Sequence, residues 1–496
     1  MSLLKNLQRS LTVYSDNQAF CIGDKFYTYG ELAEEVKVIL NGIHDQGITD
    51  STIAVVGTDE LSTYASLLAI WFSGNAYIPL GLHNPLERNK SILKEAGTNL
   101  IIASNLSNAG EYADFKILNP AILDRSKSGE FSVDDKNERL AYMLFTSGST
   151  GVPKGVPITV GNLEEFVKNF EEAGIHVRAD DRCLQMFELT FDVSISSFLV
   201  PLLHGACVYT VSSEGIRSLQ VLRIINQYKL TIIQMVPSVI NLGKGYLKSL
   251  RFDHVRISIL TGEATMITLL NLWRPCVRNA DLYNFYGPTE TTIYCSYYKC
   301  DLNNPKEYNG MLAIGKPMGA VSLVLLNEKG EIAALNEKAE LMIGGSQLTR
   351  GYLNNKEKND QSFVKFASGN QTEIFYKSGD MAYKDEDGDI FYCGRFDNQV
   401  KIQGFRVELS EIESVVRIKF NIVSFAIACA NKNGLIELFV VTDQKLDGHD
   451  VIGSLKASLP AYMIPSRVIE IENLPITTSG KVDRSKLKAM IENGHI

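Results

Sequence analysis

The sequence lacks the cysteine patterns of a disulfide framework or a zinc site. Its eight cysteines are scattered and include no C-x-x-C pair and no Cys/His cluster, which is the usage of a reducing compartment. The amino-terminal stretch MSLLKNLQRSL lacks the basic segment, apolar core and cleavage site of a secretory signal, and no apolar run is long enough to span a bilayer. We therefore expect a cytoplasmic protein without a membrane partner.

An excess of positive charge is also missing. The 496 residues carry a net charge of −8, with 45% hydrophobic and 21% charged residues, which is typical of a soluble globular protein. Nothing in this balance suggests a nucleic-acid partner. A bound nucleotide is still compatible with it, because a phosphate site depends on a few local donors and not on net charge.

Short apolar runs alternate with amphipathic stretches over most of the chain. Ile53–Val56 and Ile257–Leu260 predict strands, whereas Leu61–Trp71 and Ser218–Tyr228 have apolar residues at helical spacing and predict helices. Such alternation indicates an α/β architecture with largely parallel sheets. Residues 320–393 carry strand and turn patterns instead, which predicts a β-rich subdomain within the same large domain.

The pattern resets after Arg395. Strand-like and helix-like segments alternate again, with a helix near residues 448–459, and this length suits a small α+β domain. We place the boundary at Gly394–Asp397. The sequence therefore predicts two domains, residues 1–394 and residues 395–496.

A Ser/Thr/Gly-rich segment follows a predicted strand at residues 140–145. It reads TSGSTGVPKG over residues 146–155. Glycines let backbone N–H groups approach phosphate oxygens, hydroxyls donate hydrogen bonds, and a lysine supplies charge. The segment fails the Walker A pattern, because Lys154 follows Pro153 and not a glycine. An ordinary surface loop has the same composition. The residues predicted to bind phosphate are Thr146, Ser147, Gly148, Ser149, Thr150, Gly151 and Lys154.

The wording of this loop resembles the signature of the adenylate-forming, AMP-binding superfamily. That superfamily includes acyl-CoA synthetases, luciferases and the adenylation domains of nonribosomal peptide synthetases. Further motifs of the superfamily follow its order along nearly the whole chain. They are FYTYGELAEEV (26–36), LLAIWFSGNAYIPLG (67–81), FDVS (191–194), NFYGPTETT (284–292), AELMIGGSQLTRGYLN (339–354), YKSGDMAYKDEDGDIFYCGR (376–395), GRFDNQVKIQGFRVELSEIE (394–413), LPAYMIP (459–465) and SGKVDR (479–484).

The resemblance implies attack of a substrate carboxylate on the α-phosphate of ATP, which expels pyrophosphate. A carboxylate is already anionic, so no general base is required. The difficulty is to bring two anions together, and positioning with positive charge overcomes it. Mg²⁺ is expected beside ATP, because a divalent ion that bridges the phosphates neutralises their charge.

The resemblance also assigns polar roles. Glu290 matches the metal-contacting carboxylate, although a glutamate at a helix N-terminus is the alternative reading. Lys481 matches the catalytic lysine that touches the carboxylate, the ribose and the α-phosphate, whereas by spacing alone it is a solvated lysine. Asp380 would accept hydrogen bonds from the ribose hydroxyls with Arg395 nearby, and Asp397 matches the hinge about which the small domain rotates.

Adenine would lie between an aromatic ring and a short backbone segment. The resemblance implies that Tyr286 stacks on the base, that Asn284 binds its amino edge, and that Gly262, Glu263 and Ala264 form the opposite wall. The remaining predicted ATP contacts are Phe285, Gly287, Pro288, Thr289 and Tyr392.

Asp192 indicates the kind of acid. In adenylation domains for α-amino acids an aspartate at this position of the FDxS motif pairs with the substrate ammonium, and a buried carboxylate needs such a cation. A capping role at the following helix is the alternative. The bulky and polar neighbours favour a small or mildly polar side chain. The predicted neighbours are Val193, Ser196, Gln234, Ile259, Thr261, Phe285, Ile293 and Tyr294.

The acceptor and the exact acid remain open. LTGE at residues 260–263 has one glycine before the glutamate, as in stand-alone D-alanine carrier-protein ligases, but those ligases carry a cysteine where Thr261 stands. No carrier-domain sequence follows Arg484, so a separate phosphopantetheinylated carrier protein or coenzyme A would accept the acyl group. A piece of a larger synthetase would look the same. The alternatives are an acyl- or aryl-CoA ligase and a non-catalytic scaffold of this fold.

Overall fold

A computed structural model describes most of the chain, which forms two compact units. The first comprises Met1–Leu82, Ala96–Leu144 and Gly155–Phe396, and the second comprises His83–Glu95, Phe145–Lys154 and Asp397–Ile496. The described residues are 2–104, 109–131, 133, 136–147, 153–212, 216–368, 371–396, 399–431, 434–442, 444, 446–476 and 482–492.

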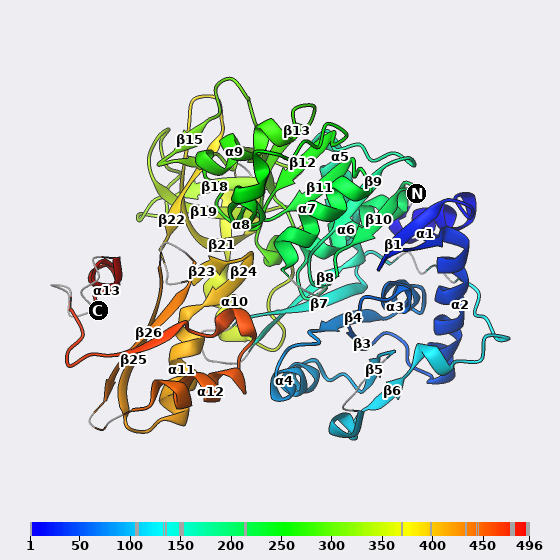
Figure 1. Cartoon of the computed structure of the whole chain (residues 1–496), viewed down its shortest axis with the longest axis horizontal. Coiled ribbons are helices and arrows are strands. Elements are labelled where there is room, and N and C mark those ends of the chain that lie inside the picture. Colours follow the sequence, from blue (N-terminus) through cyan, green and yellow to red (C-terminus); the bar gives the residue numbers. More distant parts are fainter. Residues whose placement is uncertain are drawn as a thin grey trace. The chain divides into compact units, whose positions relative to one another are not determined.

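A nine-stranded sheet dominates the first unit (Figure 1). Its six central strands are parallel, and antiparallel strands close both edges. The predicted strand Ile257–Leu260 is β12. In sheet order the strands are β17 (Lys316–Pro317), β14 (Ser296–Lys299), β13 (Asp281–Tyr286), β12 (Ile257–Leu260), β11 (Ile232–Met235), β9 (Arg182–Gln185), β10 (Cys207–Thr210), β1 (Gln18–Ile22) and β2 (Lys25–Thr28).

A second sheet of six strands precedes most of the first in the chain. Its described pairings are parallel, with β3 between β4 and β5. In sheet order the strands are β6 (Lys116–Leu118), β5 (Leu100–Ile102), β3 (Thr52–Val56), β4 (Ala76–Leu80), β7 (Leu140–Thr146) and β8 (Lys154–Thr159).

The third sheet is antiparallel, as the strand and turn pattern of residues 320–393 predicts. A small hairpin, β15 (Glu307–Tyr308) with β16 (Met311–Leu312), precedes it. The five strands are β18 (Ser322–Leu326), β19 (Ala339–Gly344), β21 (Gln371–Lys384), β20 (Phe363–Ser368) and β22 (Ile390–Arg395).

Helices cover the two parallel sheets, and their ends follow local sequence rules. Thr28 and Thr159 each accept a hydrogen bond from the N3 backbone of the following helix, in complete capping boxes. The predicted helices appear as α3 and α7. None of the described helices is long and apolar enough to cross a membrane. The helices of this unit are α1 (Leu3–Val13), α2 (Tyr29–Asp45), α3 (Leu61–Phe72), α5 (Val160–Glu172), α6 (Val193–Leu203), α7 (Arg217–Gln227), α8 (Pro237–Leu247), α9 (Ile267–Trp273) and α10 (Lys356–Ser362), with short 3₁₀ turns η1 (Ala109–Tyr112), η2 (Pro120–Ile122), η3 (Arg274–Cys276) and η4 (Thr289–Thr291).

Helix α6 is buried on all sides, because it packs between helix α3 and strands of the nine-stranded sheet. Every residue from Val193 to Leu203 is buried. Phe198 stacks on Trp71 of α3 with ring centroids 6.3 Å apart, and α6 also packs against β9 and β10 of the nine-stranded sheet. The start of α6 therefore lies deep in the unit, where a charged side chain needs compensation.

The second unit is a small α+β assembly with its own apolar core. A hairpin of β23 and β24 precedes a three-stranded sheet. The predicted mixed α/β fold, with a large amino-terminal part, a β-rich part and a small α+β part, is thus confirmed. The elements of this unit are α4 (Leu86–Ala96), β23 (Gln399–Ile402), β24 (Phe405–Glu408), α11 (Leu409–Lys419), β25 (Val423–Ala430), β26 (Ile436–Thr442), α12 (Gly448–Lys456), η5 (Ala461–Met463), β27 (Arg467–Glu470) and α13 (Arg484–Glu492).

Asp181 ties together the beginnings of three neighbouring strands of the nine-stranded sheet. Just before β9, it accepts hydrogen bonds from Arg256 Nε at 2.8 Å, from Thr231 Oγ1 at 2.7 Å and from the Arg178 backbone N–H at 2.7 Å. Burial opposes ionisation of this carboxyl, but the donors, Arg256 foremost, outweigh it and hold the pKa of Asp181 below its usual value.

Replacing Arg256 by leucine is expected to lower the free energy of unfolding at neutral pH by about 1.5–3 kcal/mol, the range for a hydrogen bond to a charged group. The depressed pKa of Asp181 means that its contribution is present above the unfolded pKa of about 3.9. That contribution is lost as the pH falls through the lower, folded value. Urea unfolding of both proteins at neutral and acidic pH should show the difference shrinking in acid, and a pH-independent difference contradicts this account.

Candidate active site

Several predicted site residues lie in the carboxyl-terminal halves of adjacent parallel strands or just after them. Gln234 on β11 pairs with Ile259 on β12, and Leu260 pairs with Asn284 on β13. Thr261 directly follows β12. Ligands of open α/β sheets bind beyond this edge, so the strand register alone brings residues distant in sequence to one place.

Asp192 immediately precedes α6 and is buried, with 7% of its surface exposed. Although it stands at the N-cap position, its carboxylate forms no capping hydrogen bond within the described part of the chain. Burial, and then the negative charge of Asp192, raise the pKa of Tyr77 on β4 and of Tyr142 on β7 well above the usual value. The charge thus acts on the six-stranded sheet as well as on its own side of the unit.

The negative charge of Asp192 also acts on Tyr294, which lies on the side of the nine-stranded sheet. Burial raises its pKa, hydrogen bonds with Ser196 and Thr261 oppose the rise, and the charge of Asp192 adds to it. Its hydroxyl donates to Gln234 Oε1 at 3.0 Å, and Ser196 Oγ lies 3.0 Å from the same oxygen. Predicted neighbours from α6, β11, the β12 end and the segment after η4 therefore form one hydrogen-bonded group.

The remaining predicted neighbours are apolar and surround this group. Phe285 on β13 packs on Tyr294 with ring centroids 4.9 Å apart, and Ile293 is buried directly before Tyr294. Val193 is the first residue of α6, one position after Asp192.

A separate polar cluster links β13 to the β21–β22 hairpin. Asp380 accepts hydrogen bonds from the Tyr286 hydroxyl and from Arg395 Nη1, the latter at 2.6 Å. Burial, followed by the charge of Asp380, raises the pKa of Tyr286 well above its usual value. The carboxylate of Asp380 is therefore oriented from both sides, and each oxygen retains capacity for a further donor such as a ribose hydroxyl.

Part of the hydrogen-bonding capacity of Asn284 is used within the protein, which limits the adenine contact predicted for it. Its Nδ2 donates to the Ala313 carbonyl at 2.8 Å, and its Oδ1 accepts from Thr265 Oγ1 at 2.8 Å. An amide oxygen has a second lone pair. A donor on the base therefore has one place to bind on this side chain, at Oδ1.

Glu290 is completely buried in the short turn η4. The Tyr352 hydroxyl donates to Glu290 Oε1 at 2.7 Å, and the Thr349 backbone N–H donates to the Glu290 carbonyl at 2.9 Å. A three-residue 3₁₀ turn has little dipole to favour a glutamate, so the alternative reading has weak physical support. An oriented, buried carboxylate is a ligand type that suits Mg²⁺.

The opposite wall predicted for adenine begins at Gly262, and Thr261 separates it from the end of β12. Gly262 adopts φ +82°, a conformation that favours glycine. The Glu263 carboxylate accepts from the Ser238 backbone N–H, at the start of α8, at 2.9 Å. Glu263 therefore contributes to holding this segment beside α8, and Ala264 follows it in the chain.

The loop predicted to bind phosphate is described only at its edges. Thr146 ends β7 and is followed by Ser147, and Lys154 begins β8. Gly287 and Pro288 connect β13 to η4, which begins at Thr289, and Tyr392 pairs with Ala382 in the β21–β22 hairpin. The predicted residues outside the described part of the chain are Gly148, Ser149, Thr150, Gly151, Asp397 and Lys481.

Residues 7–353 match the family model for AMP-binding enzymes. The chain belongs to the AMP-binding enzyme family. This match confirms the resemblance that the ordered motifs indicate. It also confirms that the chain is an AMP-forming ligase.

Relatives of this AMP-binding enzyme include parts of long synthetases. Tyrocidine synthase 1 of Brevibacillus parabrevis is 28% identical over an alignment of 502 positions, which covers 98% of this chain and 45% of that protein. Gramicidin S synthase 1 of Brevibacillus brevis is 30% identical over an alignment of 489 positions, which covers 95% of this chain and 43% of that protein. The chain thus spans less than half the length of either relative.

Solved structures of adenylation domains share the fold. The Vibrio cholerae adenylation domain AlmE, in complex with glycyl-adenosine-5′-phosphate, has a TM-score of 0.87 at 25% identity and covers 99% of this chain and 98% of its own. PA1221, a protein with adenylation and PCP domains, has a TM-score of 0.84 at 20% identity, with 99% and 97% covered.

The sequence motifs did not predict a role for Gln347. This residue stabilises the turn that places Ile293 and Tyr294 in the site of the AMP-binding enzyme. Thr292 and Ile293 have φ +57° and +71°, and such a conformation costs about 1–3 kcal/mol per non-glycine residue. Buried Gln347 donates through Nε2 to the carbonyls of Thr292, at 3.2 Å, and Tyr294, at 2.8 Å. Its place in the GGSQLTRGYL motif was the only sequence signal.

Three aspartates in the β21–β22 turn resemble a metal site but already hold a cation. Lys306 Nζ lies 2.7 Å from Asp385, 2.7 Å from Asp387 and 2.6 Å from Asp389. Hydrogen bonds to these carboxylates outweigh the effect of burial and raise the pKa of Lys306. The ammonium therefore serves as the counter-ion, and Glu290 remains the carboxylate predicted to bind Mg²⁺.

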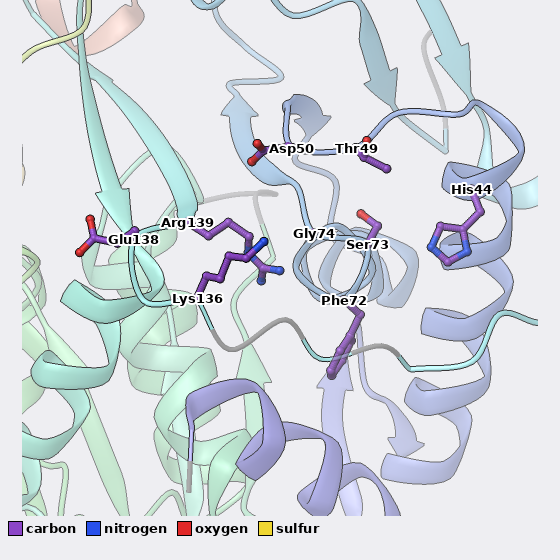
Figure 2. Close-up of a pocket in the computed structure, with 9 residues that line it drawn as sticks. All are labelled: His44, Thr49, Asp50, Phe72, Ser73, Gly74, Lys136, Glu138 and Arg139. Atoms are coloured by element: carbon purple, nitrogen blue, oxygen red, sulfur yellow. The ribbon is translucent and has the colours of Figure 1, made fainter.

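A cavity of about 490 Å³ lies away from all of the predicted site residues. Figure 2 shows Lys136 and Arg139 extending toward the end of α3, with His44 on the opposite side. Arg139 donates to the Trp71 carbonyl at 3.0 Å, so it satisfies part of the carboxyl end of that helix. The cavity is lined by none of the residues predicted for ATP or for the amino acid.

Proposed function

We propose that this AMP-binding enzyme activates an amino acid as an aminoacyl adenylate and transfers it to a phosphopantetheine thiol of a carrier protein. Buried Asp192 carries the proposal. Its side chain does not cap α6, and it stands where the motif predicts the partner of a substrate ammonium. An acid without that ammonium cannot form the proposed ion pair with Asp192.

In the first step, the carboxylate oxygen of the amino acid bonds to the α-phosphorus of ATP. The bond between this phosphorus and the bridging oxygen breaks, and pyrophosphate leaves with the electron pair. Asp192 orients the amino acid through its ammonium, and Asp380, aligned by Tyr286 and Arg395, accepts from the ribose hydroxyls. Glu290 would hold the Mg²⁺ ion, which neutralises charge on the phosphates when bound.

In the second step, a thiolate attacks the acyl carbonyl, and AMP leaves with the electron pair of the broken C–O bond. We assign Lys481 and Lys154 to charge compensation in the first step. We also assign residues 395–496 to a mobile domain that turns about Asp397 after residues 1–394 bind ATP and substrate. Such a rearrangement completes one site and then opens it for another reactant.

ATP–pyrophosphate exchange over a panel of acids tests the proposal. Exchange that depends on an amino acid and on Mg²⁺ is expected, whereas exchange that depends only on aryl or fatty acids supports an acyl- or aryl-CoA ligase. No exchange with any acid supports a non-catalytic role. A radiolabelled amino acid then distinguishes the acceptors, because label should transfer to a holo-carrier protein and not to coenzyme A.

A further inference from the structure

We infer that the amino acid is glycine or alanine, because protein side chains fill the place that a longer substrate side chain needs. This inference rests on the proposed amino-acid adenylation and narrows it to a substrate class. It concerns the group formed by Asp192, Ser196, Gln234, Ile259 and Tyr294, which we name the side-chain site.

The exposed fraction of these residues decreases from Asp192 to the buried residues of the side-chain site. Asp192 keeps 7% of its surface exposed and Gln234 keeps 5%, whereas Ser196, Ile259 and Tyr294 are at 0%. A residue with no exposed surface borders no space that can hold a water molecule. Of these five residues only Asp192 and Gln234 keep exposed surface, so we place the substrate side chain beside them. The fully buried Ser196, Ile259 and Tyr294 then leave no room for a long side chain.

Tyr294 is the main obstacle, and its ring is supported from behind. Phe166, Phe170 and Phe285 pack against it with ring centroids 6.0, 6.2 and 4.9 Å away. Its hydroxyl is bonded to Gln234 Oε1 at 3.0 Å. A substrate that displaced this ring would break a buried hydrogen bond and disturb an aromatic cluster, and close-packed interiors resist both changes.

The backbone before Tyr294 is also fixed. Gln347 binds the carbonyls on both sides of the positive-φ residue Ile293, and Thr292 Oγ1 returns a hydrogen bond of 2.6 Å to the Gln347 carbonyl. Asn169 Nδ2 in turn donates to Gln347 Oε1 at 2.7 Å. Retreat of Tyr294 would therefore require several buried bonds to break together. The steric obstacle to a larger substrate side chain is therefore present before a substrate binds.

Selectivity follows from size. A hydrogen or a methyl group on the substrate fits beside Gln234, and one methyl group distinguishes two substrates by only ~10- to 200-fold. A valine, leucine or phenylalanine side chain must overlap Tyr294, and overpacking of this kind is unfavourable. We therefore expect glycine or alanine to exceed leucine and phenylalanine in kcat/KM by at least ~100-fold.

The test is ATP–pyrophosphate exchange with each of the 20 amino acids, for the wild type, Y294A and Y297A. Wild type should rank glycine or alanine first, and Y294A should raise the leucine-to-glycine ratio of kcat/KM at least ~10-fold, because it removes the obstructing ring. Tyr297 is the matched control: its ring stacks 5.7 Å from Phe285 outside the side-chain site, so the ranking should not change. If Y294A does not fold, Y294L serves as the enlarging variant.

A wild type that prefers any amino acid other than glycine or alanine overturns the size inference and leaves amino-acid adenylation standing. An unchanged leucine-to-glycine ratio in a folded Tyr294 variant overturns the role of Tyr294. Exchange with no amino acid overturns the proposed function and this inference together. The two failures are thus distinguishable in one data set.

Discussion

The D192N variant is expected to lose most of its kcat/KM for the amino acid. Removing one partner of a buried, hydrogen-bonded charge pair costs about 2–5 kcal/mol, which corresponds to roughly 30- to several-thousandfold. Asparagine keeps the shape of the side chain but not its charge. Since the ammonium is present in the ground state and in the transition state alike, the loss should appear mainly as a higher KM for the amino acid.

ATP–pyrophosphate exchange at varied amino acid and varied ATP measures this split. The KM for ATP should stay within about twofold, and D281N, which alters an exposed ion pair with Lys299 at the start of β13, should behave as wild type because such pairs contribute little. An acid without the ammonium gives a second readout. The preference for glycine over acetate should collapse in D192N, and an unchanged preference contradicts the assignment of Asp192.

The E290Q variant is expected to reduce kcat by roughly 100- to 1,000-fold, which is typical when a preorganised electrostatic contact is removed. Glutamine can still accept the hydrogen bond that Tyr352 donates to Oε1, so the fold should be retained. What it loses is the negative charge that would hold Mg²⁺. Titration of Mg²⁺ in the exchange assay should show a higher requirement and incomplete recovery at saturation.

The Y352F variant separates metal binding from packing. It removes the hydroxyl that orients Glu290 and preserves the ring, and outer-shell changes of this kind cost about 10–100-fold in metal affinity or activity. Its effect should therefore lie between wild type and E290Q, with the same direction of change in Mg²⁺ dependence. Equal Mg²⁺ dependence in all three proteins, each with an unchanged melting temperature, contradicts the assignment of Glu290 to the metal.

Local patterns predicted the elements well, because apolar spacing records which face of each segment is buried. The run Ile257–Leu260 is β12, and the stretch Leu61–Trp71 corresponds to α3, Leu61–Phe72. The capping reading of Asp192 was also testable by geometry, and it fails because the side chain forms no cap at α6. In these cases the information lies within a few neighbouring residues.

The long-range support of the site could not be predicted in this way. Gln347 holds carbonyls 53 to 56 positions earlier in the chain, and the Tyr286 hydroxyl binds Asp380, 94 positions later. Lys306 likewise neutralises three aspartates around 80 positions away. No local period or motif spacing specifies which distant donor will meet which acceptor, because the packing of whole sheets decides it.

Oxygen transfer tests the central claim, carboxylate attack on the α-phosphate, most directly. The amino acid, labelled with ¹⁸O in both carboxylate oxygens, is incubated with the protein, ATP and Mg²⁺, and the adenylate is trapped with hydroxylamine. Mass spectrometry of the products should find the amino-acid hydroxamate and one ¹⁸O atom in each AMP, because the bridging oxygen leaves with AMP. Unlabelled AMP, or label in inorganic phosphate or pyrophosphate, contradicts the account.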